Sequence, residues 1–421
     1  MSELSYLEKL LDGVEVEWKS LGEIATKIYS GGTPDTKRIE YWENGTIPWM
    51  SSGEVNLKNI ERTEKYITEA GLNNSSAKLV PRNSVVIALA GQGKTRGKVA
   101  RIRIALATNQ SLAALTFDEK KFSSDYVFHF LETQYESLRQ ISSGNSGRGG
   151  LNLQMISAYK IPIPCPGNPE KSLAIQSEIV RILDKFTALT AELTAELNMR
   201  KKQYNYYRDQ LLSFKEGEVE WKTLEEVLVD KFWIMPATPK FDDNGEIPYI
   251  TSKNISGGNI DFERVKHISR DDFLSISKNR PILKGDFLIS MIGTIGEIAR
   301  VKCLDPDFYG QNMYLIRLNE ELLHPRYFLH FFDSPRMKFY FKSVKNNSGQ
   351  GYLKANNIDG LSIPLPSIDE QQKIAFILDK FDTLTNSITE GLPREIELRQ
   401  KQYEYYRDLL FSFPKPETVS N

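Results

Sequence analysis

The chain has 421 residues, 40% of them hydrophobic and 11% aromatic, and a formal net charge of -1. This length is too great for one ordinary hydrophobic core and suits two domains with connecting elements. The near-zero charge means that a nucleic-acid surface must concentrate positive charge on one face or receive it from a partner. Because no apolar run approaches the roughly 18 to 20 residues of a membrane span, and the start of the chain lacks a signal-peptide pattern, we expect a cytoplasmic protein without a membrane partner.

The chain opens with a short leucine-rich segment that leads into a mixed globular region. Residues 1–13 place leucines at helical spacing, which predicts a helical segment. Residues 14–168 contain short apolar runs separated by Gly, Asn, Ser and Pro turns, which predict buried strands, and an aromatic segment that predicts a helix packed on the sheet. The strands are expected at 85–89 and 112–115, and the helix at 126–131. The fold class of this region is therefore α/β or α+β.

A long amphipathic helix is predicted for residues 169–215. Its apolar residues alternate steps of three and four, which is typical of the seam of a coiled coil. The stripe consists of Ile179, Ile182, Phe186, Leu189, Leu193 and Leu197, and resumes at Tyr204, Tyr207, Leu211 and Phe214. Such a stripe buries itself either on another helix or on its own domain.

The second half of the chain follows the same plan, with a globular region at 216–367, a helical region at 368–413 and a tail at 414–421. Strands are expected at 287–292 and 314–316, and an aromatic helix at 327–332. The second stripe consists of Ile374, Ile377, Phe381, Leu384 and Ile388, followed by Ile396, Tyr403, Tyr406, Leu410 and Phe413. Gly391-Leu392-Pro393 predicts a break between two helices, because Gly suits a C-terminal cap and Pro a first turn.

The two halves repeat the same segments in the same order. The matched segments are 15–21 with 218–224, 47–49 with 247–249, 161–164 with 363–366, 183–186 with 378–381, and 204–214 with 403–413. A duplicated unit of this length should fold twice, with its copies about an approximate twofold axis.

Because the two stripes match each other, we expect two long helices that pair as an antiparallel coiled coil and separate two similar globular domains. Residues 1–13 resemble the segment that follows the first helix, so we expect a cyclic arrangement with neighbouring termini. Helix pairing is assigned to Phe186, Leu189, Leu193, Tyr207, Leu211, Phe381, Leu384, Ile388, Tyr406 and Leu410.

Several motifs occur in an order that belongs to a known family. They are 16–24 (VEWKSLGEI), 30–34 (SGGTP), 47–53 (IPWMSSG), the Ile-Pro segments at 161–164 and 363–366, 370–374 (EQQKI), and the two Tyr-Tyr-Arg-Asp helices. On these motifs the chain resembles the specificity (S) subunits of Type I restriction-modification enzymes, over nearly its whole length.

The resemblance implies two target-recognition domains, each reading one half of a split DNA sequence, and two helices that act as spacer and as docking site. The implied partners are double-stranded DNA, two methyltransferase subunits, and restriction subunits that join through them. Carried over to this chain, the recognition domains are 14–168 and 216–367, and the spacer helices are 169–215 and 368–413. One departure is Ser-Gly-Gly-Thr-Pro at 30–34, which has no clean copy in 234–239, so we expect the two domains to differ in specificity.

Polar, glycine-rich loops at equal depth in the two halves are the candidate DNA contacts. The loop at 91–98 offers Lys94, Arg96 and Lys98 for contact with phosphates or entry into a groove. The loops at 142–150 and 345–351 offer guanidinium and amide groups, which pair with guanine and adenine in the major groove. These candidates are Asn145, Arg148, Asn346, Asn347 and Gln350. An ordinary exposed turn is the alternative for each loop.

The sequence offers no catalytic residue, cofactor site or metal site, which predicts a recognition subunit rather than an enzyme. The four histidines and two cysteines are too scattered for a metal cluster, and His129 and His330 are expected to pack between paired helices. Two other functions remain open. Residues 88–95 end in Gly-Lys-Thr like a P-loop, although Ala88 replaces its first glycine, so one is a nucleotide hydrolase. The other is a coiled-coil scaffold without DNA specificity.

Overall fold

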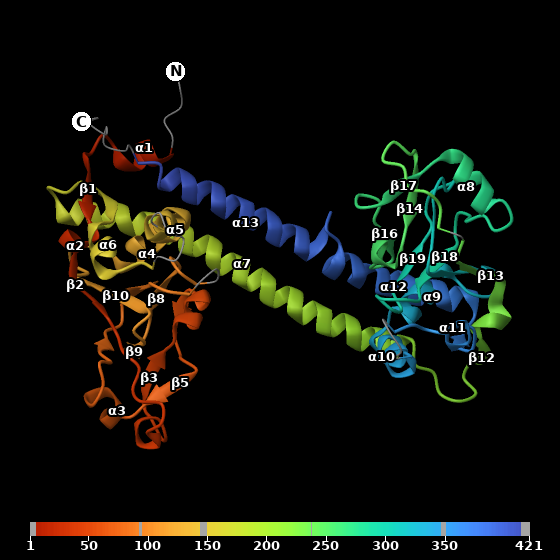
Figure 1. Cartoon of the computed structure of the whole chain (residues 1–421), viewed down its shortest axis with the longest axis horizontal. Helices are drawn as coiled ribbons and strands as arrows, with labels where there is room; N and C mark the ends of the chain where they lie inside the picture. The colour runs from red at the N-terminus through yellow and green to blue at the C-terminus, as the bar shows by residue number, and fades with distance from the viewer. Residues whose placement is uncertain (1–5, 92–94, 144–149, 237, 347–350, 414–421) are drawn as a thin grey trace. The chain divides into compact units, whose positions relative to one another are not determined.

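The computed structural model describes residues 6–91, 95–143, 150–236, 238–346 and 351–413, which form two compact units (Figure 1). Unit 1 comprises residues 1–192 and 397–421, and unit 2 comprises residues 193–396. Both boundaries fall within helices, namely α7 (Pro169–Leu211) and α13 (Gly391–Leu410). Each unit therefore combines one globular part with pieces of helices that are distant in the sequence. None of the described helices is both long enough and apolar enough to span a bilayer.

Unit 1 is built on two mixed sheets and one short strand pair. The first sheet has the order β2-β10-β7-β8-β4, the second has the order β5-β3-β9-β6, and β1 pairs with β11. The strands are β1 (Val16–Ser20), β2 (Ala25–Ser30), β3 (Ile47–Met50), β4 (Asn59–Ile60), β5 (Lys65–Ile67), β6 (Leu79–Val80), β7 (Ser84–Ala88), β8 (Val99–Ile102), β9 (Leu106–Thr108), β10 (Leu112–Phe117) and β11 (Lys160–Pro164). The helices are α1 (Tyr6–Leu11), α2 (Leu21–Ile24), η1 (Ile39–Tyr41), η2 (Ser52–Leu57), α3 (Glu69–Asn73), α4 (Ser124–Thr133), α5 (Tyr135–Ser143) and α6 (Leu153–Ala158).

Unit 2 repeats this plan. Its sheets have the orders β13-β21-β18-β19 and β17-β14-β20, with the pairs β12-β22 and β15-β16. The strands are β12 (Glu220–Thr223), β13 (Leu228–Ile234), β14 (Ile247–Ile250), β15 (Ile255–Ser256), β16 (Asn259–Ile260), β17 (Lys266–Ile268), β18 (Phe287–Ser290), β19 (Ile298–Arg300), β20 (Tyr309–Gly310), β21 (Met313–Leu318) and β22 (Ser362–Leu365). The helices are η4 (Leu224–Val227), η5 (Ser252–Asn254), α8 (Arg270–Ser277), α9 (Pro325–Phe332), α10 (Pro335–Val344), α11 (Ala355–Asp359) and α12 (Ile368–Asn386).

The apolar runs of the sequence form the central strands of both units, as predicted. In unit 1, β7 is buried along its whole length and pairs with β10. In unit 2, β18 is likewise buried and pairs with β21. The aromatic segments form α4 and α9, whose rings lie in the cores of their units. The mixed α/β class expected from the sequence is thus confirmed for each unit.

In each unit, the first and last strands of the globular part pair with each other, and a matching hydrogen bond joins the aromatic helix to the last strand. Trp18 on β1 is paired with Pro162 on β11, and the Tyr126 hydroxyl donates to the Pro162 carbonyl oxygen at 2.7 Å. In unit 2, Trp221 is paired with Pro364, and the Tyr327 hydroxyl donates to the Pro364 carbonyl at 2.9 Å. The duplication in sequence is therefore a duplication in structure.

The two described ends of the chain lie in the core of unit 1. Leu7 and Leu11 of α1 are buried in the same cluster as Leu410, which ends α13, and Phe413, which follows it (Figure 1). In unit 2 the corresponding junction is continuous, because the chain passes from the end of α7 through the buried Leu212 into β12. This is the cyclic arrangement expected from the sequence.

The helices differ in continuity, as predicted. α7 is unbroken over 43 residues, whereas α12 ends at Asn386 and α13 begins at Gly391. Gly391 has φ +81°, and an added Cβ would lie 2.5 Å from the Thr383 carbonyl oxygen. This position therefore requires glycine.

The long helix α7 pairs with a different helix in each unit. In unit 1, Phe186 of α7 stacks on Tyr406 of α13, with ring centroids 5.3 Å apart and planes at 22°. In unit 2, Phe381 of α12 stacks on Tyr207 and Tyr204 of α7, at 5.5 Å and 6.1 Å. The first turns of α7 instead bury Ile175, Ile179 and Leu183 in the unit 1 core. Both uses of the stripe, helix pairing and burial on the globular part, thus occur in one helix.

The other positions assigned to helix pairing vary in burial. Leu410 is buried in the unit 1 core, and Leu211 packs on the unit 2 core, while Leu189, Leu193 and Leu384 are half-buried. Ile388 was assigned wrongly, because it lies in the link between α12 and α13 and its side chain is 79% exposed. The helix does not continue through this link.

Candidate nucleic-acid interface

Two loops that are distant in the sequence meet in each unit. In unit 1, the Leu151 amide donates to the carbonyl of Leu89, which follows β7, at 3.1 Å. In unit 2, the Leu353 amide donates to the Met291 carbonyl at 2.9 Å, and Tyr352 forms a β-bridge with Ile292. The residues that flank the glycine-rich loops at 91–98 and 142–150 therefore meet, and in unit 2 the residues that follow the loop at 345–351 meet those that follow β18.

A third segment, the turn after β3 or β14, is held by a capping box. In unit 1, the Glu54 carboxylate accepts from the Ser51 amide at 2.6 Å. In unit 2, the Asn254 side-chain oxygen accepts from the Thr251 amide at 2.9 Å. The Thr294 hydroxyl, on the β18–β19 loop, donates to the Ser252 carbonyl at 3.0 Å and ties this turn to the loop pair.

In unit 2 these segments enclose a groove of about 570 Å³. All of the charged side chains that line it are basic. Its charged side chains are Lys253, Arg264 and Lys266, and no acidic side chain from the described residues lines it. Hydroxyl and amide groups of Thr251, Ser252, Asn254, Thr294 and Asn312 complete its polar surface. Within the described chain, none of the three cations forms an ion pair. The groove is thus suited to an anionic ligand.

The region of unit 1 that matches this groove, around β3 and β5, carries different side chains. The registers that pair Ile47 with Ile67 and Ile247 with Ile268 place Lys65 at the position of Lys266. By the same register, Thr63 stands in place of Arg264, and Gly53 follows β3 where Lys253 follows β14. The shared lysine lies over an aromatic ring in both units, Trp42 at 6.0 Å and Phe241 at 4.2 Å. The two matched regions therefore share their strand register and one lysine but differ in charge.

The residues predicted to contact DNA lie only partly within the described structure. Lys94, Asn145, Arg148, Asn347 and Gln350 are outside the described residues. Lys98 donates to the Asn56 side-chain oxygen at 2.7 Å and lines a smaller hollow beside Lys58 and Glu132. Arg96 is half-buried, and the Asn346 amide donates to the Tyr352 hydroxyl at 3.0 Å. Their contact with DNA stays a prediction.

The three groove cations were not predicted from the sequence. Lys253 lies in η5, Arg264 in the turn before β17 and Lys266 at the start of β17, so they form no run in the sequence. The available signal was the duplicated Ile-Pro-Trp or Ile-Pro-Tyr strand, since Lys253 stands shortly after its second copy.

The Thr-Pro end of segment 30–34 recurs at Thr238, although the three residues before Thr33 have no copy in the second half. The Thr33 hydroxyl donates to the Gln110 side-chain oxygen at 2.6 Å. The Thr238 hydroxyl donates to the Gln311 side-chain oxygen at 3.3 Å. Different residues before each threonine hide this match in the sequence.

The sequence matches the family described as Type I restriction modification DNA specificity domain, over residues 13–200 and again over 217–398. The chain belongs to this family. It is 43% identical to the Type I restriction enzyme EcoR124I/EcoR124II specificity subunit of Escherichia coli, with full coverage of both chains. It is 38% identical to the EcoprrI specificity subunit of Escherichia coli, over 93% of each chain.

A solved structure of the S subunit from M. genitalium has the same fold. It superposes with a TM-score of 0.56 at 14% sequence identity and covers 96% of this chain and 98% of its own. The family resemblance drawn from the motifs is therefore confirmed.

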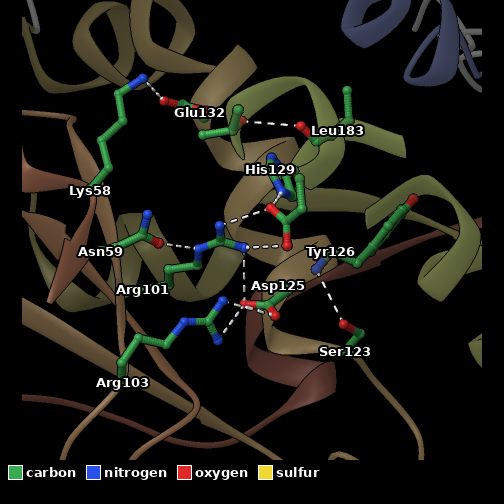
Figure 2. A network of polar contacts seen from close by, with 12 residues as sticks. Lys58, Asn59, Arg101, Arg103, Ser123, Asp125, Tyr126, His129, Glu132 and Leu183 are labelled. Atoms are coloured by element: carbon green, nitrogen blue, oxygen red, sulfur yellow. Dashed lines mark hydrogen bonds and ion pairs between the residues drawn. The ribbon is translucent and has the colours of Figure 1, made fainter. Parts of the chain in front are cut away.

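In this specificity-subunit fold, a buried polar network fixes the globular part of unit 1 on α7 (Figure 2). The Asp184 carboxylate of α7 accepts from Arg101 of β8 at 2.8 Å and contacts the His129 Nε2 of α4 at 2.9 Å. Arg101 also contacts Asp125 at 3.4 Å and donates to Asn59. Burial alone would raise the pKa of Asp184, but the bonds from His129 and Arg101 hold that pKa well below its usual range.

Unit 2 uses the same aspartate and histidine with an arginine from another element. Asp379 of α12 contacts the His330 Nε2 at 2.6 Å and accepts from Arg326 of α9 at 2.8 Å. Although burial opposes it, these bonds lower the pKa of Asp379 to about 2. The Tyr204 hydroxyl lies 2.9 Å from the other His330 ring nitrogen. Both histidines thus lie between helices, as expected.

The P-loop interpretation is wrong. A P-loop connects a strand to a helix whose N-terminus faces phosphate. Here β7 is followed by β8, which pairs with it in antiparallel fashion. Thr95 donates its hydroxyl to the Ala90 carbonyl at 3.1 Å. β7 and β8 thus form a hairpin, and the family assignment likewise gives no support to a nucleotide hydrolase or a scaffold without DNA specificity.

Proposed function

We propose that this chain is the DNA sequence-specificity subunit of a Type I restriction-modification complex and carries no catalytic site of its own. Unit 1 reads one half of a bipartite, asymmetric site and unit 2 reads the other. The recognition regions are residues 14–168 and 216–367, and the spacers are 169–215 and 368–413. Support comes from the family match over both halves and from relatives named as specificity subunits of Type I restriction enzymes.

The observation that carries this proposal is the basic groove of unit 2. A chain with net charge -1 has little general attraction for DNA. Yet three cations without ion pairs gather at one groove, beside hydroxyl and amide groups of the kind that contact bases and phosphates. The matched region of unit 1 has Gly53 and Thr63 in place of two of these cations. Such a difference suits two half-sites of different sequence.

Removing a groove cation should reduce the salt dependence of DNA binding. We expect Lys253→Ala and Lys266→Ala each to lower the slope of log K against log salt concentration by about 0.9, since each phosphate contact releases counterions. The measurement is binding of a duplex by the chain with its methyltransferase subunits across a salt series. Lys284→Ala, an exposed lysine of unit 2 outside the groove, is the matched control and should leave the slope unchanged. Unchanged slopes for both groove variants would remove the groove from the DNA interface.

The helices are proposed to bind two methyltransferase subunits, and restriction subunits join through these. An exposed tyrosine recurs at the same point of the Tyr-Tyr-Arg-Asp segment in each unit, Tyr206 at 61% and Tyr405 at 64% exposure. Each packs edge-to-face on the next tyrosine, at 5.4 Å in both cases. These repeated side chains are not buried within the chain. They are therefore best explained as contacts for a partner that is present in two copies.

Each exposed tyrosine should therefore support binding of one methyltransferase subunit. We expect Tyr206→Ala or Tyr405→Ala alone to leave one subunit bound, and the double variant to lose both, because truncating an interface tyrosine commonly costs about 2 kcal/mol or more. Native mass spectrometry of the mixed complex gives the stoichiometry. Phe339→Ala provides the control, since this ring is 75% exposed but has no counterpart in unit 1. Full assembly in the double variant would place the docking surface elsewhere.

A further inference from the structure

One glutamine stands at the same place in both units and is held in the same way. Gln110 and Gln311 each lie just before the strand that pairs with the central buried strand, β10 in unit 1 and β21 in unit 2. In both, the side-chain oxygen accepts from a threonine hydroxyl, Thr33 at 2.6 Å and Thr238 at 3.3 Å. In unit 2, the Tyr249 hydroxyl adds a contact to the same oxygen at 3.4 Å. The oxygen end of each amide is thus fixed by the protein.

The nitrogen end of each amide remains available. Gln110 is exposed and Gln311 is half-buried, and the described part of the chain offers no hydrogen-bond partner to either side-chain nitrogen. An amide NH₂ only donates hydrogen bonds, so its complement must be an acceptor.

Gln311 stands at the edge of the basic groove. Its neighbour Asn312 and its partner Tyr249 both line that groove, together with Lys253, Arg264 and Lys266. A ligand drawn there by three cations is anionic, and its oxygens are acceptors. Geometry and charge therefore point to the same kind of ligand group.

We propose that the side-chain amides of Gln110 and Gln311 each donate a hydrogen bond to a phosphate oxygen of the DNA backbone, at equivalent positions of the two half-sites. This inference rests on the proposed function. A side chain that read a base would impose the same base on both halves. The identical, identically held glutamine instead suits a feature that both halves share, which is the phosphate backbone. Base reading belongs to positions that differ between the units, such as Arg264, which is exposed and stands where unit 1 has a buried threonine.

Thr33 and Thr238 are positioning residues in this arrangement. By holding the side-chain oxygen, each hydroxyl directs the NH₂ group away from the protein and limits rotation of the amide. A contact prepared in this way loses less conformational entropy on binding.

The test measures DNA affinity of the complex formed by the full chain and its methyltransferase subunits. The probe is a duplex carrying the methylated sequence found for the wild type. We expect Gln110→Ala and Gln311→Ala each to weaken binding by roughly ten- to a hundredfold, the usual effect of losing one hydrogen bond to a charged group. The salt slope should stay at its wild-type value, because a neutral side chain displaces no counterion. The preferred sequence should also stay the same.

Threonine variants and modified DNA sharpen this test. Thr33→Val and Thr238→Val, which remove the hydroxyl at similar volume, should give part of the glutamine effect, and the serine variants should restore binding. Single phosphates of the duplex can be replaced by uncharged methylphosphonate. At one position in each half-site, the wild-type complex and the glutamine variant should then bind the modified duplex with equal affinity, because the contact is already lost.

Two results would overturn the inference: unchanged affinity in both glutamine variants, or a changed base preference in either half-site, which would make the glutamine a base reader. A wild-type complex without sequence preference would instead overturn the proposed function. The two failures are therefore distinguishable.

Discussion

Replacement of Asp184 by alanine is expected to lower the free energy of unfolding of unit 1 by about 2 to 3 kcal/mol. The reason is the burial of its partners, since Arg101 is 6% exposed and His129 is 1% exposed. Without the carboxylate, a buried guanidinium keeps its bond to Asn59 but only one anionic contact, with Asp125 at 3.4 Å. The expected loss is below that of a fully buried ion pair because the Asp184 side chain itself is 35% exposed.

Urea denaturation of the full chain measures this loss, and the neighbouring Lys185→Ala is the control. Lys185 is exposed on the same helix, so its removal should change the free energy of unfolding by less than about 0.5 kcal/mol. Equal stability of the two variants would show that the network in Figure 2 does not hold the globular part of unit 1 on α7.

Deletion of residues 387–390 is expected to change the number of unread base pairs between the half-sites and to leave both half-site sequences intact. These residues form the non-helical link between α12 and α13, and none of them lines the basic groove. Four residues correspond to about 6 Å of α-helix, or close to two base pairs at about 3.4 Å each. We therefore expect a change of about one or two base pairs in the spacer.

Modified-base sequencing of DNA from cells that express the deletion variant with its methyltransferase gives both half-sites and the spacing. Replacement of the same four residues by alanines keeps the chain length and is the matched control, which should retain the wild-type spacing. If the deletion variant altered a half-site and kept the wild-type spacing, the helices would not control the spacing.

The sequence predicted the architecture well because the strongest signals were periodic or duplicated. Burial of both faces makes central strands apolar throughout, which identified β7 and β18. Duplication then paired each element with its copy, and Gly391 marked the helix break. Ile388 was misassigned because three- and four-residue spacing continues through the link, whereas the helix does not.

The candidate site was harder to predict, because it is assembled from segments that meet only in the folded chain. Each glycine-rich loop was recognisable alone, but their meeting depends on bonds such as Leu353 to Met291. Arg264 gives no local signal, since its place in the groove follows from the register of β17 on β14. The short Thr-Pro match of Thr238 with Thr33 gains structural meaning only through their glutamine partners.

The most direct test of two units reading two half-sites is modified-base sequencing of DNA methylated by the wild-type complex and by a complex carrying Arg264→Thr. This substitution gives unit 2 the side chain that unit 1 has at the matched position. Our account predicts two different half-sites at a fixed spacing for the wild type, and relaxed preference within only one of them for the variant. A single continuous recognition sequence, or a change in both half-sites from this one substitution, would contradict it.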